Sequence, residues 1–510
     1  NAGNSITSGG NYNTTIGDEA GTAITTGDNN VAVGYNSLTA NTTGTDSVAI
    51  GHSALLAQTT GGDNVAIGHL AMSSLTTAGN NTAVGDRAMQ ANTSGENNVA
   101  IGTLALDANT TGASNTAVGR DSLTANTTGT QNTAVGKSAL AANTTAGQNT
   151  AMGREALFAN TTGADNTAIG AAALYSNTTA SSNTAVGRSC LINNTTGAEN
   201  VAVGAESLDA NTTGVQNNAI GYLSLTSCTT GSYNVAMGVA ALNDTTTGES
   251  NVALGHLSSY SNLTGSSNTA VGQKSFYTNT TGTSNVVVGK SAMYYNTTGA
   301  GNTAVGVNAL TANTTASNNT AVGTDALKAN TTGSLNVAVG RHALIGCTTG
   351  SDNTGIGTYA LDSTTTGNSN IAIGHGAIST SSTASGQCTL GNSAISNLRC
   401  NDTSISSLSD SRDKTDVVDS PFGLDFINTV RPVQFLWDSR DGNAKDGTTR
   451  IGFLAQELLA ATNGNNAVLD LVLDDNPDKL EAKYGNLLPI MVQAIQELST
   501  QNAALEARLT

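Results

Sequence analysis

The chain has 510 residues, of which 4% are aromatic and 11% are charged, with 58 glycines and a net charge of −17. The acidic balance argues against nucleic acid as the main partner, because phosphate binding needs a basic surface. No apolar run approaches the ~18–20 residues that span a bilayer, so we expect no membrane insertion. The five cysteines are widely spaced and form no Cys-x-x-Cys pair, so we expect neither a metal nor another cofactor.

The composition changes near residue 400. All four prolines and the only tryptophan, Trp437, lie after that point. From residue 398 onward, ten Lys/Arg and seventeen Asp/Glu give a charge of −7, which leaves −10 for the first 397 residues. We therefore predict two domains, residues 1–397 and residues 398–510.

Residues 1–397 consist of one short repeat. A glycine closes an Ala-Val-Gly-like tripeptide at Gly17, Gly34 and every 17 residues up to Gly391, which makes 23 occurrences. Asn-Thr-Ala-Val-Gly favours an extended strand, the Asn-Thr-Thr-Gly corner favours a turn with left-handed angles, and Ser-Leu or Ala-Leu suggests a second extended piece. One repeat is thus predicted to be one coil of a parallel β-solenoid or β-roll, with two short strands. With strands ~4.8 Å apart, 23 coils give a shaft on the order of 110 Å long.

The same repeat suggests association of copies. Alternate side chains of a strand point to opposite faces, and here Val118 makes one face aliphatic while Ala117 makes the other small and apolar. A strand that is apolar on both faces favours burial on both faces, but a thin coil has one interior. We therefore expect the second face to pack on another chain, where the small alanine permits close approach.

The repeat resembles the head of trimeric autotransporter adhesins. Those heads are trimeric β-rolls built from Asn-Ser-Val-Ala-Ile-Gly-like units, and residues 46–51 read Asp-Ser-Val-Ala-Ile-Gly. The repeat departs from those heads in its extra residues at the Asn-Thr-Thr-Gly corner. The resemblance implies a trimeric β-roll over nearly all of residues 1–397.

Other interpretations of the repeat stay open. Asn-Thr-Thr matches the N-glycosylation sequon, although a ladder of turns needs no glycan. Aligned threonine columns suggest an ice-binding face, although these threonines are expected at a corner rather than on a flat surface. His52 and His69 hold equivalent positions in adjacent coils. They predict stacked surface rings, with a metal site as the alternative.

The C-terminal segment mixes helices and strands. The pattern predicts a short helix at 422–427, a strand at 433–437, a turn at 438–442, a strand at 450–454 and a helix from 455. A final helix over 486–510 carries a heptad seam, which predicts a trimeric coiled coil. The seam residues are Leu488, Met491, Ile495, Leu498, Asn502, Leu505 and Leu509.

This segment resembles the endosialidase-type intramolecular chaperone at the C-termini of phage tail spikes and tail fibres. The matching pieces are Ser-Asp-Ser-Arg-Asp-Lys at 409–414, Arg-Pro-Val-Gln-Phe at 431–435, Gly-Phe-Leu-Ala-Gln-Glu at 452–457 and the stretch 484–498. Their order matches as well, and the resemblance covers about residues 404–510.

The resemblance implies that the segment trimerises, templates the shaft and then cleaves itself off between Leu408 and Ser409. Ser409 holds the position of the nucleophile and Lys414 that of the base, since a serine hydroxyl needs a base to become nucleophilic. Asp410 and Arg412 would order the loop. The expected chemistry is at most this single self-cleavage, and no turnover enzyme is predicted.

These observations together predict a homotrimeric phage tail fibre, located in the virion, that attaches to a host surface. Its expected partners are other copies of itself and a host receptor, either a glycan or an outer-surface protein. The alternative is a cellular surface adhesin or extracellular filament that retains its C-terminal domain. Binding of ice or carbohydrate by the threonine columns is a third possibility.

Overall fold

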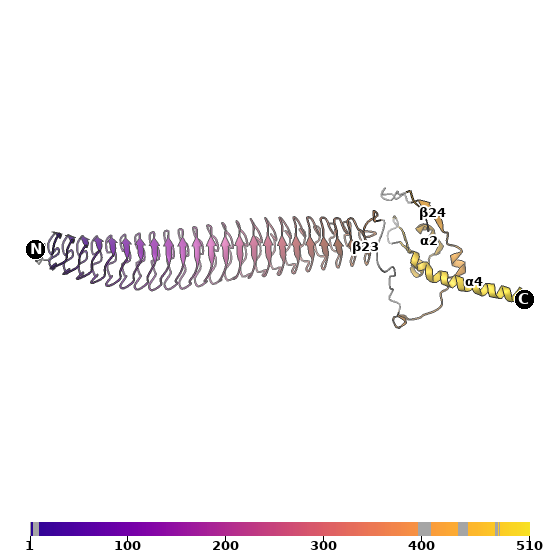
Figure 1. The fold of residues 1–510 in the computed structure, drawn as a ribbon, viewed down its shortest axis with the longest axis horizontal. Coiled ribbons are helices and arrows are strands. Elements are labelled where there is room, and N and C mark those ends of the chain that lie inside the picture. The colour runs from indigo at the N-terminus through magenta and orange to yellow at the C-terminus, as the bar shows by residue number, and fades with distance from the viewer. Residues whose placement is uncertain are drawn as a thin grey trace. The chain divides into compact units, whose positions relative to one another are not determined.

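The computed structural model describes residues 2–3, 10–395, 410–436, 447–474, 478 and 480–509. The chain divides into two compact units, residues 1–332 and residues 333–510. The repeats in both units form coils of a parallel β-solenoid, and each 17-residue repeat contributes one strand of three residues (Figure 1). Strands pair in parallel one repeat apart, as Thr116 does with Thr133. The predicted solenoid is therefore confirmed.

Nineteen strands lie in residues 1–332. They are β1 (Thr14–Ile16), β2 (Val31–Val33), β3 (Val48–Ile50), β4 (Val65–Ile67), β5 (Thr82–Val84), β6 (Val99–Ile101), β7 (Thr116–Val118), β8 (Thr133–Val135), β9 (Thr150–Met152), β10 (Thr167–Ile169), β11 (Thr184–Val186), β12 (Val201–Val203), β13 (Asn218–Ile220), β14 (Val235–Met237), β15 (Val252–Leu254), β16 (Thr269–Val271), β17 (Val286–Val288), β18 (Thr303–Val305) and β19 (Thr320–Val322). The solenoid strands of residues 333–510 are β20 (Val337–Val339), β21 (Thr354–Ile356), β22 (Ile371–Ile373) and β23 (Cys388–Leu390).

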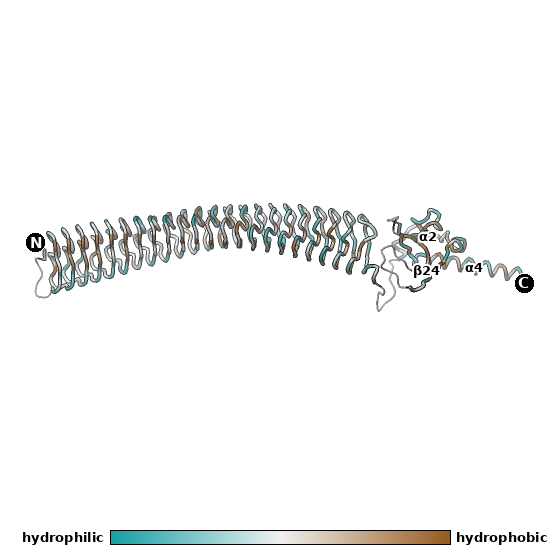
Figure 2. The backbone as a smooth tube through the Cα atoms, turned by 90° about the horizontal axis from the view of Figure 1, so that it is seen from above, coloured by the Kyte–Doolittle hydropathy of each residue, from teal (hydrophilic) through white to brown (hydrophobic). Residues whose placement is uncertain are grey.

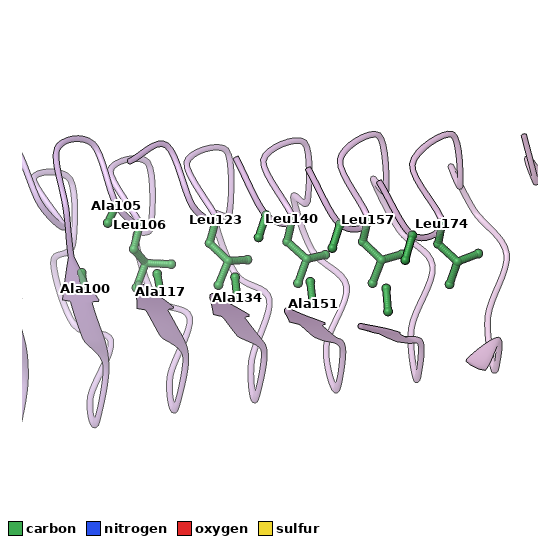
Figure 3. Close-up of a cluster of buried hydrophobic side chains, with 14 of the residues drawn as sticks. Ala100, Ala105, Leu106, Ala117, Leu123, Ala134, Leu140, Ala151, Leu157 and Leu174 are labelled. Carbon is green, nitrogen blue, oxygen red and sulfur yellow. The ribbon is translucent and has the colours of Figure 1, made fainter. Parts of the chain in front are cut away.

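The solenoid core is a column of alanines facing a column of leucines. In β7 the middle residue, Ala117, is completely buried, and Thr116 and Val118 on either side are half-buried. Leu123, from the opposite wall of the coil, is also completely buried. Figure 3 shows the two columns running through successive coils, with the leucine side chains directed toward the strands. Each coil therefore contains both hydrophobic and hydrophilic stretches, which are coloured brown and teal in Figure 2.

The expected role of the alanine was wrong. Ala117 does not face outward toward another chain but inward, where its small side chain leaves room for the leucine of the opposite wall. The outward face of the strand carries the larger residues Thr116 and Val118. Any copy that packs on this sheet therefore meets β-branched side chains instead of alanines.

The expectation of a second strand in each coil was also wrong. Asp121 and Leu123 have left-handed backbone angles, with φ of 57° and 50°. A leucine in this region costs about 1–2 kcal/mol. The conformation is stabilised because the N–H of Leu123 donates to the carbonyl oxygen of Ala139 in the next coil at 3.0 Å, and because the side chain is buried. The opposite wall is thus a series of turns.

The glycines have a different role from the one expected. At the Asn-Thr-Thr-Gly corner, neither Asn126 nor Gly129 has a positive φ. Gly129 instead permits close stacking, because an added Cβ would lie 2.3 Å from the carbonyl oxygen of Ala146 in the next coil. At the strand end, Gly119 needs both properties, since its φ is +131° and an added Cβ would lie 2.6 Å from the carbonyl oxygen of Gly136.

The rest of residues 333–510 forms a small α+β region, which confirms the predicted class. Its elements are α1 (Leu424–Ile427), β24 (Val433–Leu436), β25 (Thr449–Gly452), α2 (Ala455–Ala461), α3 (Asn466–Leu469), β26 (Val472–Leu473), β27 (Glu481–Ala482) and α4 (Leu487–Leu509), with single 3-10 turns η1 (Ser411–Asp413) and η2 (Tyr484–Asn486). β24 pairs with β25 and β26 with β27, both antiparallel. Trp437 and the predicted turn at 438–442 lie outside the described residues.

The core of this region is built from its helices together with β26 and the residue before it. Its buried members are Phe426, Leu458, Leu469, Leu471, Val472, Leu487 and Ile490. Two of them, Leu487 and Ile490, come from the first turn of α4, so the start of the last helix is anchored in the core.

Candidate functional site

The predicted cleavage junction lies directly before the turn η1, and Leu408 and Ser409 lie outside the described residues. Asp410 caps η1, because its Oδ1 accepts a hydrogen bond from the backbone N–H of Arg412 at 2.9 Å. The Arg412 guanidinium binds the same carboxylate, with Nε 3.0 Å from Oδ1 and Nη2 2.5 Å from Oδ2. These bonds from Arg412 hold the pKa of Asp410 below its ordinary value. The pair orders the backbone of residues 410–412.

Lys414 closes the same turn. Its backbone N–H donates to the carbonyl oxygen of Ser411 at 3.3 Å, and its side chain is exposed. A general base has to come within hydrogen-bond reach of the hydroxyl that it deprotonates. Because Ser409 lies outside the described residues, its pairing with Lys414 stays a prediction.

One ion pair joins two of the sequence pieces that carry the family resemblance. Arg431, from Arg-Pro-Val-Gln-Phe, places Nε 2.9 Å from Oε2 of Glu457, the last residue of Gly-Phe-Leu-Ala-Gln-Glu. Arg431 Nη2 also binds Glu457 Oε1. Such a two-point pair fixes orientation as well as distance. The hydrogen bonds from Arg431 hold the pKa of Glu457 below its ordinary value.

A second carboxylate, which the sequence reasoning missed, ties α4 to α1. Glu497 Oε2 accepts a hydrogen bond from the backbone N–H of Leu424 at 2.7 Å. This bond lowers the pKa of Glu497. In the sequence, only Gly423 could have indicated this contact. It stands at the N-cap of α1 and has no side chain to satisfy the first N–H groups of that helix. Glu497 supplies the missing acceptor.

The predicted heptad seam lies on an exposed side of α4. Its apolar members are 46–80% exposed. The neighbouring side of the helix is buried through Leu487, Ile490 and Ala494. One copy of the helix thus has two apolar sides and covers only one of them. The exposed members are Leu488, Met491, Ile495, Leu498, Leu505 and Leu509.

Two columns of buried asparagines run through the solenoid, and sequence reasoning had assigned them only to strand and turn. In the column before the strands, the backbone N–H of Asn132 donates to Asn115 Oδ1 at 3.0 Å. The Nδ2 of Asn132 donates to the carbonyl oxygen of Ala146 at 2.9 Å. At the corner, Asn126 Nδ2 donates to Asn109 Oδ1 at 2.9 Å. The signal in the sequence was the strict recurrence of asparagine, which a turn alone does not require.

The structure bears on the glycan, threonine and histidine interpretations of the repeat. The sequon residue Asn126 is completely buried, so a glycan cannot be attached without opening the coil. Thr127 Oγ1 donates to the carbonyl oxygen of Thr144 at 3.0 Å, which engages the first corner threonine with the next coil. The His52 and His69 rings lie next to each other in adjacent coils as predicted, with centroids 5.3 Å apart, but their planes are tilted by 49° and are not stacked. In the part of the chain that the structure describes, no His, Cys, Asp and Glu side chains gather into a metal-binding group.

Comparison with known proteins identifies one family. The family model of the chaperone of endosialidase, peptidase family S74, matches residues 409–469. Neither the curated proteins nor the solved structures contain a match to the chain. Among the described residues, no helix is long and apolar enough to cross a bilayer. The chain therefore combines a long β-solenoid with a C-terminal endosialidase-type chaperone domain.

Proposed function

We propose that the protein is a homotrimeric attachment fibre of the phage tail-fibre kind, in which the solenoid is the shaft and the C-terminal domain assembles three copies. The observation that carries this proposal is the chaperone domain at 409–469 following a solenoid of near-identical repeats. Near-identical coils can pair in many wrong registers, and non-local strand pairing is slow. A domain that aligns three chains at one end removes this ambiguity before the shaft folds.

The strand face of the solenoid supports association with further copies. The first and third strand positions carry no charged residue in any of the 23 strands, although the chain has a net charge of −17. Ile50, Ile101 and Met152 on this face are 38%, 41% and 43% exposed. Long exposed apolar strips mark interaction surfaces. Because the strip repeats with the coil, its natural complement is the same strip of another copy, which has the same spacing.

The apolar seam of α4 supports the same assembly. Three copies packed through Leu488, Ile495 and Leu505 would bury side chains that a single copy leaves 64%, 64% and 55% exposed. Asn502 on the seam would set the register of the three helices at a cost in stability.

The proposal includes one self-cleavage. Ser409 Oγ attacks the carbonyl carbon of Leu408 while Lys414 accepts the hydroxyl proton. The C–N bond then breaks, and Lys414 returns this proton to the amide nitrogen, which leaves as a new amine. Water then hydrolyses the ester and releases the shaft. The Asp410–Arg412 pair supports this role by ordering the residues that follow the bond.

The intact mass of the recombinant chain, compared with that of a Ser409→Ala variant, tests this step. We expect a product that ends at Leu408 in the parent protein only. Full-length chain in both samples would contradict self-cleavage and would favour the alternative, a surface adhesin that retains its C-terminal domain.

Two double variants, each with lysines introduced on one wall of the coil, test the shaft interface. Val118→Lys with Val135→Lys places charges on the strand face, whereas Thr124→Lys with Ala125→Lys places them on the opposite wall. Light scattering should show loss of the trimer, or a lower thermal midpoint, for the first variant only. Equal trimer stability in both variants would contradict packing through the strand face.

A further inference from the structure

Four tyrosines interrupt the repeat in one part of the shaft. Tyr260, Tyr277 and Tyr294 occupy the same position in successive coils, with ring centroids 5.3 Å and 4.9 Å apart and ring planes within 17°. Tyr295 crosses the end of this stack at 69°, with its centroid 4.7 Å from that of Tyr294. These four residues are called the tyrosine platform below.

The other coils show that the solenoid does not need these rings. The position of Tyr295 holds a small residue in coils that fold in the same way, namely Ala108, Ala125, Ala142, Ala159, Ala210, Ala312 and Ala329. Phe158 and Tyr175 form a stacked pair elsewhere, 5.0 Å apart, with Ala159 and Ser176 in place of a crossing ring. Stacking between coils therefore explains the ladder but not Tyr295.

The platform combines an open aromatic face with polar groups. Tyr295 is 54% exposed, and its ring meets that of Tyr294 at 69° instead of continuing the parallel ladder. The Lys274 ammonium lies 5.9 Å from the Tyr277 ring centroid. The Asp244 carboxylate is close enough to Tyr260 to raise the pKa of the phenol. One strip thus presents a flat ring, phenol hydroxyls, a cation and a carboxylate.

The platform lies on the wall that the proposed trimer leaves accessible. Its residues follow the strand-end glycine by five and six positions, on the turn wall opposite the strands. The uncharged strand face is the one proposed to contact other copies. The platform would therefore face solvent in the assembled fibre.

We propose that the tyrosine platform is a receptor-binding site for a glycan of the host surface, an assignment that rests on the attachment function proposed above. Ring faces pack against the C–H faces of sugars, while phenols, carboxylates and ammonium groups bond sugar hydroxyls. Tyrosine provides rigid amphipathic contact area at low entropic cost.

The size of the platform favours a glycan over a folded protein. With coils ~4.8 Å apart, the four coils from Asp244 to Tyr295 span roughly 15 Å between their outer members. A stable protein interface covers about 800 Å² on each partner, which is more than this strip provides. A short oligosaccharide fits within it.

Binding of the trimer obtained by expressing the whole chain to an array of neutral, sialylated and sulfated oligosaccharides tests the assignment. Tyr295→Ala, a residue that other coils carry at this position, should weaken binding to the recognised glycan about tenfold or more. Tyr295→Phe should retain most of the binding, because it keeps the ring. Tyr175→Ala is the matched control, since it removes a stacked ring away from the platform and should leave binding unchanged.

Two outcomes would overturn the assignment. A parent trimer that binds no glycan on the array, or that binds only a host protein, would rule out a glycan site. Equal binding by the parent and Tyr295→Ala would place the receptor site elsewhere while leaving the attachment function intact. Light scattering on the same samples reports trimer assembly, so a failure of the proposed fibre is distinguished from a failure of the platform.

Discussion

The solenoid and the C-terminal domain bury their surfaces in different ways. The stacked coils of the solenoid complete their core within one chain, since Ala117 and Leu123 are both completely buried. The last helix of the C-terminal domain does not, because Leu488 and Ile495 are each 64% exposed. The difference indicates that a single chain can form the interior of a coil but not the complete C-terminal assembly. This division fits a domain whose task is to collect copies.

The two regions also differ in their polar contacts. The solenoid relies on neutral amides, such as Asn126 bonded to Asn109. The C-terminal domain relies on carboxylates, with Glu457 bound to Arg431 and Glu497 bound to the N–H of Leu424. Amide ladders do not titrate in the ordinary pH range, whereas carboxylates do. The two regions should therefore respond differently to sequence changes and to acid.

The largest effect is expected at the strand-end glycines of the solenoid. Gly136→Ala places a Cβ 2.5 Å from the carbonyl oxygen of Gly153 at a φ of +135°, and should cost more than about 3 kcal/mol. Gly129→Ala should cost much less, even though its Cβ would lie 2.3 Å from Ala146 O. Ala146 and Ala180 already occupy that corner in other coils, so the backbone can adjust there.

Thermal unfolding of the two glycine variants, followed by circular dichroism, measures this difference. Equal decreases of the midpoint would contradict the expectation that a Cβ at Gly136 costs more stability than one at Gly129.

Enlarging the alanine column should have the next largest effect. Ala117→Leu, Ala134→Leu and Ala168→Leu each overpack a completely buried site and should cost ~1–3 kcal/mol. Ala125→Leu adds the same volume on the outward side of the turn wall and serves as the control. A thermal midpoint unchanged by the three core substitutions would contradict the inward placement of the alanines.

A smaller effect is expected where the corner ladder is interrupted. Cys228 stands in the asparagine column, and the buried Oδ1 of Asn211 in the preceding coil has no hydrogen-bond partner. Cys228→Asn should supply that donor and stabilise the shaft by about 1 kcal/mol. The reverse change, Asn126→Cys, should destabilise it by a similar amount. Denaturant unfolding measures both, and shifts of the same sign would contradict the ladder.

Acid should act on the two regions in opposite directions. The lowered pKa values of Glu457 and Glu497 contribute stability that is complete above the ordinary glutamate value of 4.5 and is lost as the pH falls below it. Burial raises the pKa of Asp107 and of Asp209 in the solenoid. A raised carboxyl pKa contributes stability that is complete below the ordinary aspartate value of 3.8 and is lost as the pH rises through the raised value.

Pepsin digestion of the Ser409→Ala protein, which keeps both regions in one chain, checks this contrast at about pH 3, with fragments identified by mass spectrometry. Peptides from residues 410–509 should appear first, while the solenoid resists. Proteolysis at neutral pH with a broad-specificity protease is the control. There, the difference in time of appearance between C-terminal peptides and solenoid peptides should be smaller. Early release of solenoid peptides in acid would contradict the expected signs.

Much of the fold could be predicted from local patterns. The Asn-Thr-Ala-Val-Gly stretch at 115–119 contains the strand β7, and the patterns at 433–437 and from 455 correspond to β24 and α2. The left-handed conformation of Leu123 could not be predicted, because leucine ordinarily avoids such angles. It is stabilised there by the hydrogen bond to the next coil and by burial of the side chain. The candidate cleavage site was inferred from a family resemblance, and of its residues the structure describes Asp410, Arg412 and Lys414.

By itself, the sequence determined the period of the solenoid and the order of the two regions. A 17-residue spacing without insertions excludes stacking that is shifted by a single residue, since such a slip would turn the apolar column outward. Only the tertiary structure decided which strand face is the core and that Asn126 is a buried ladder residue. Both depend on the space between the two walls of a coil and on the groups of the neighbouring coil, and neither is a property of one repeat in isolation.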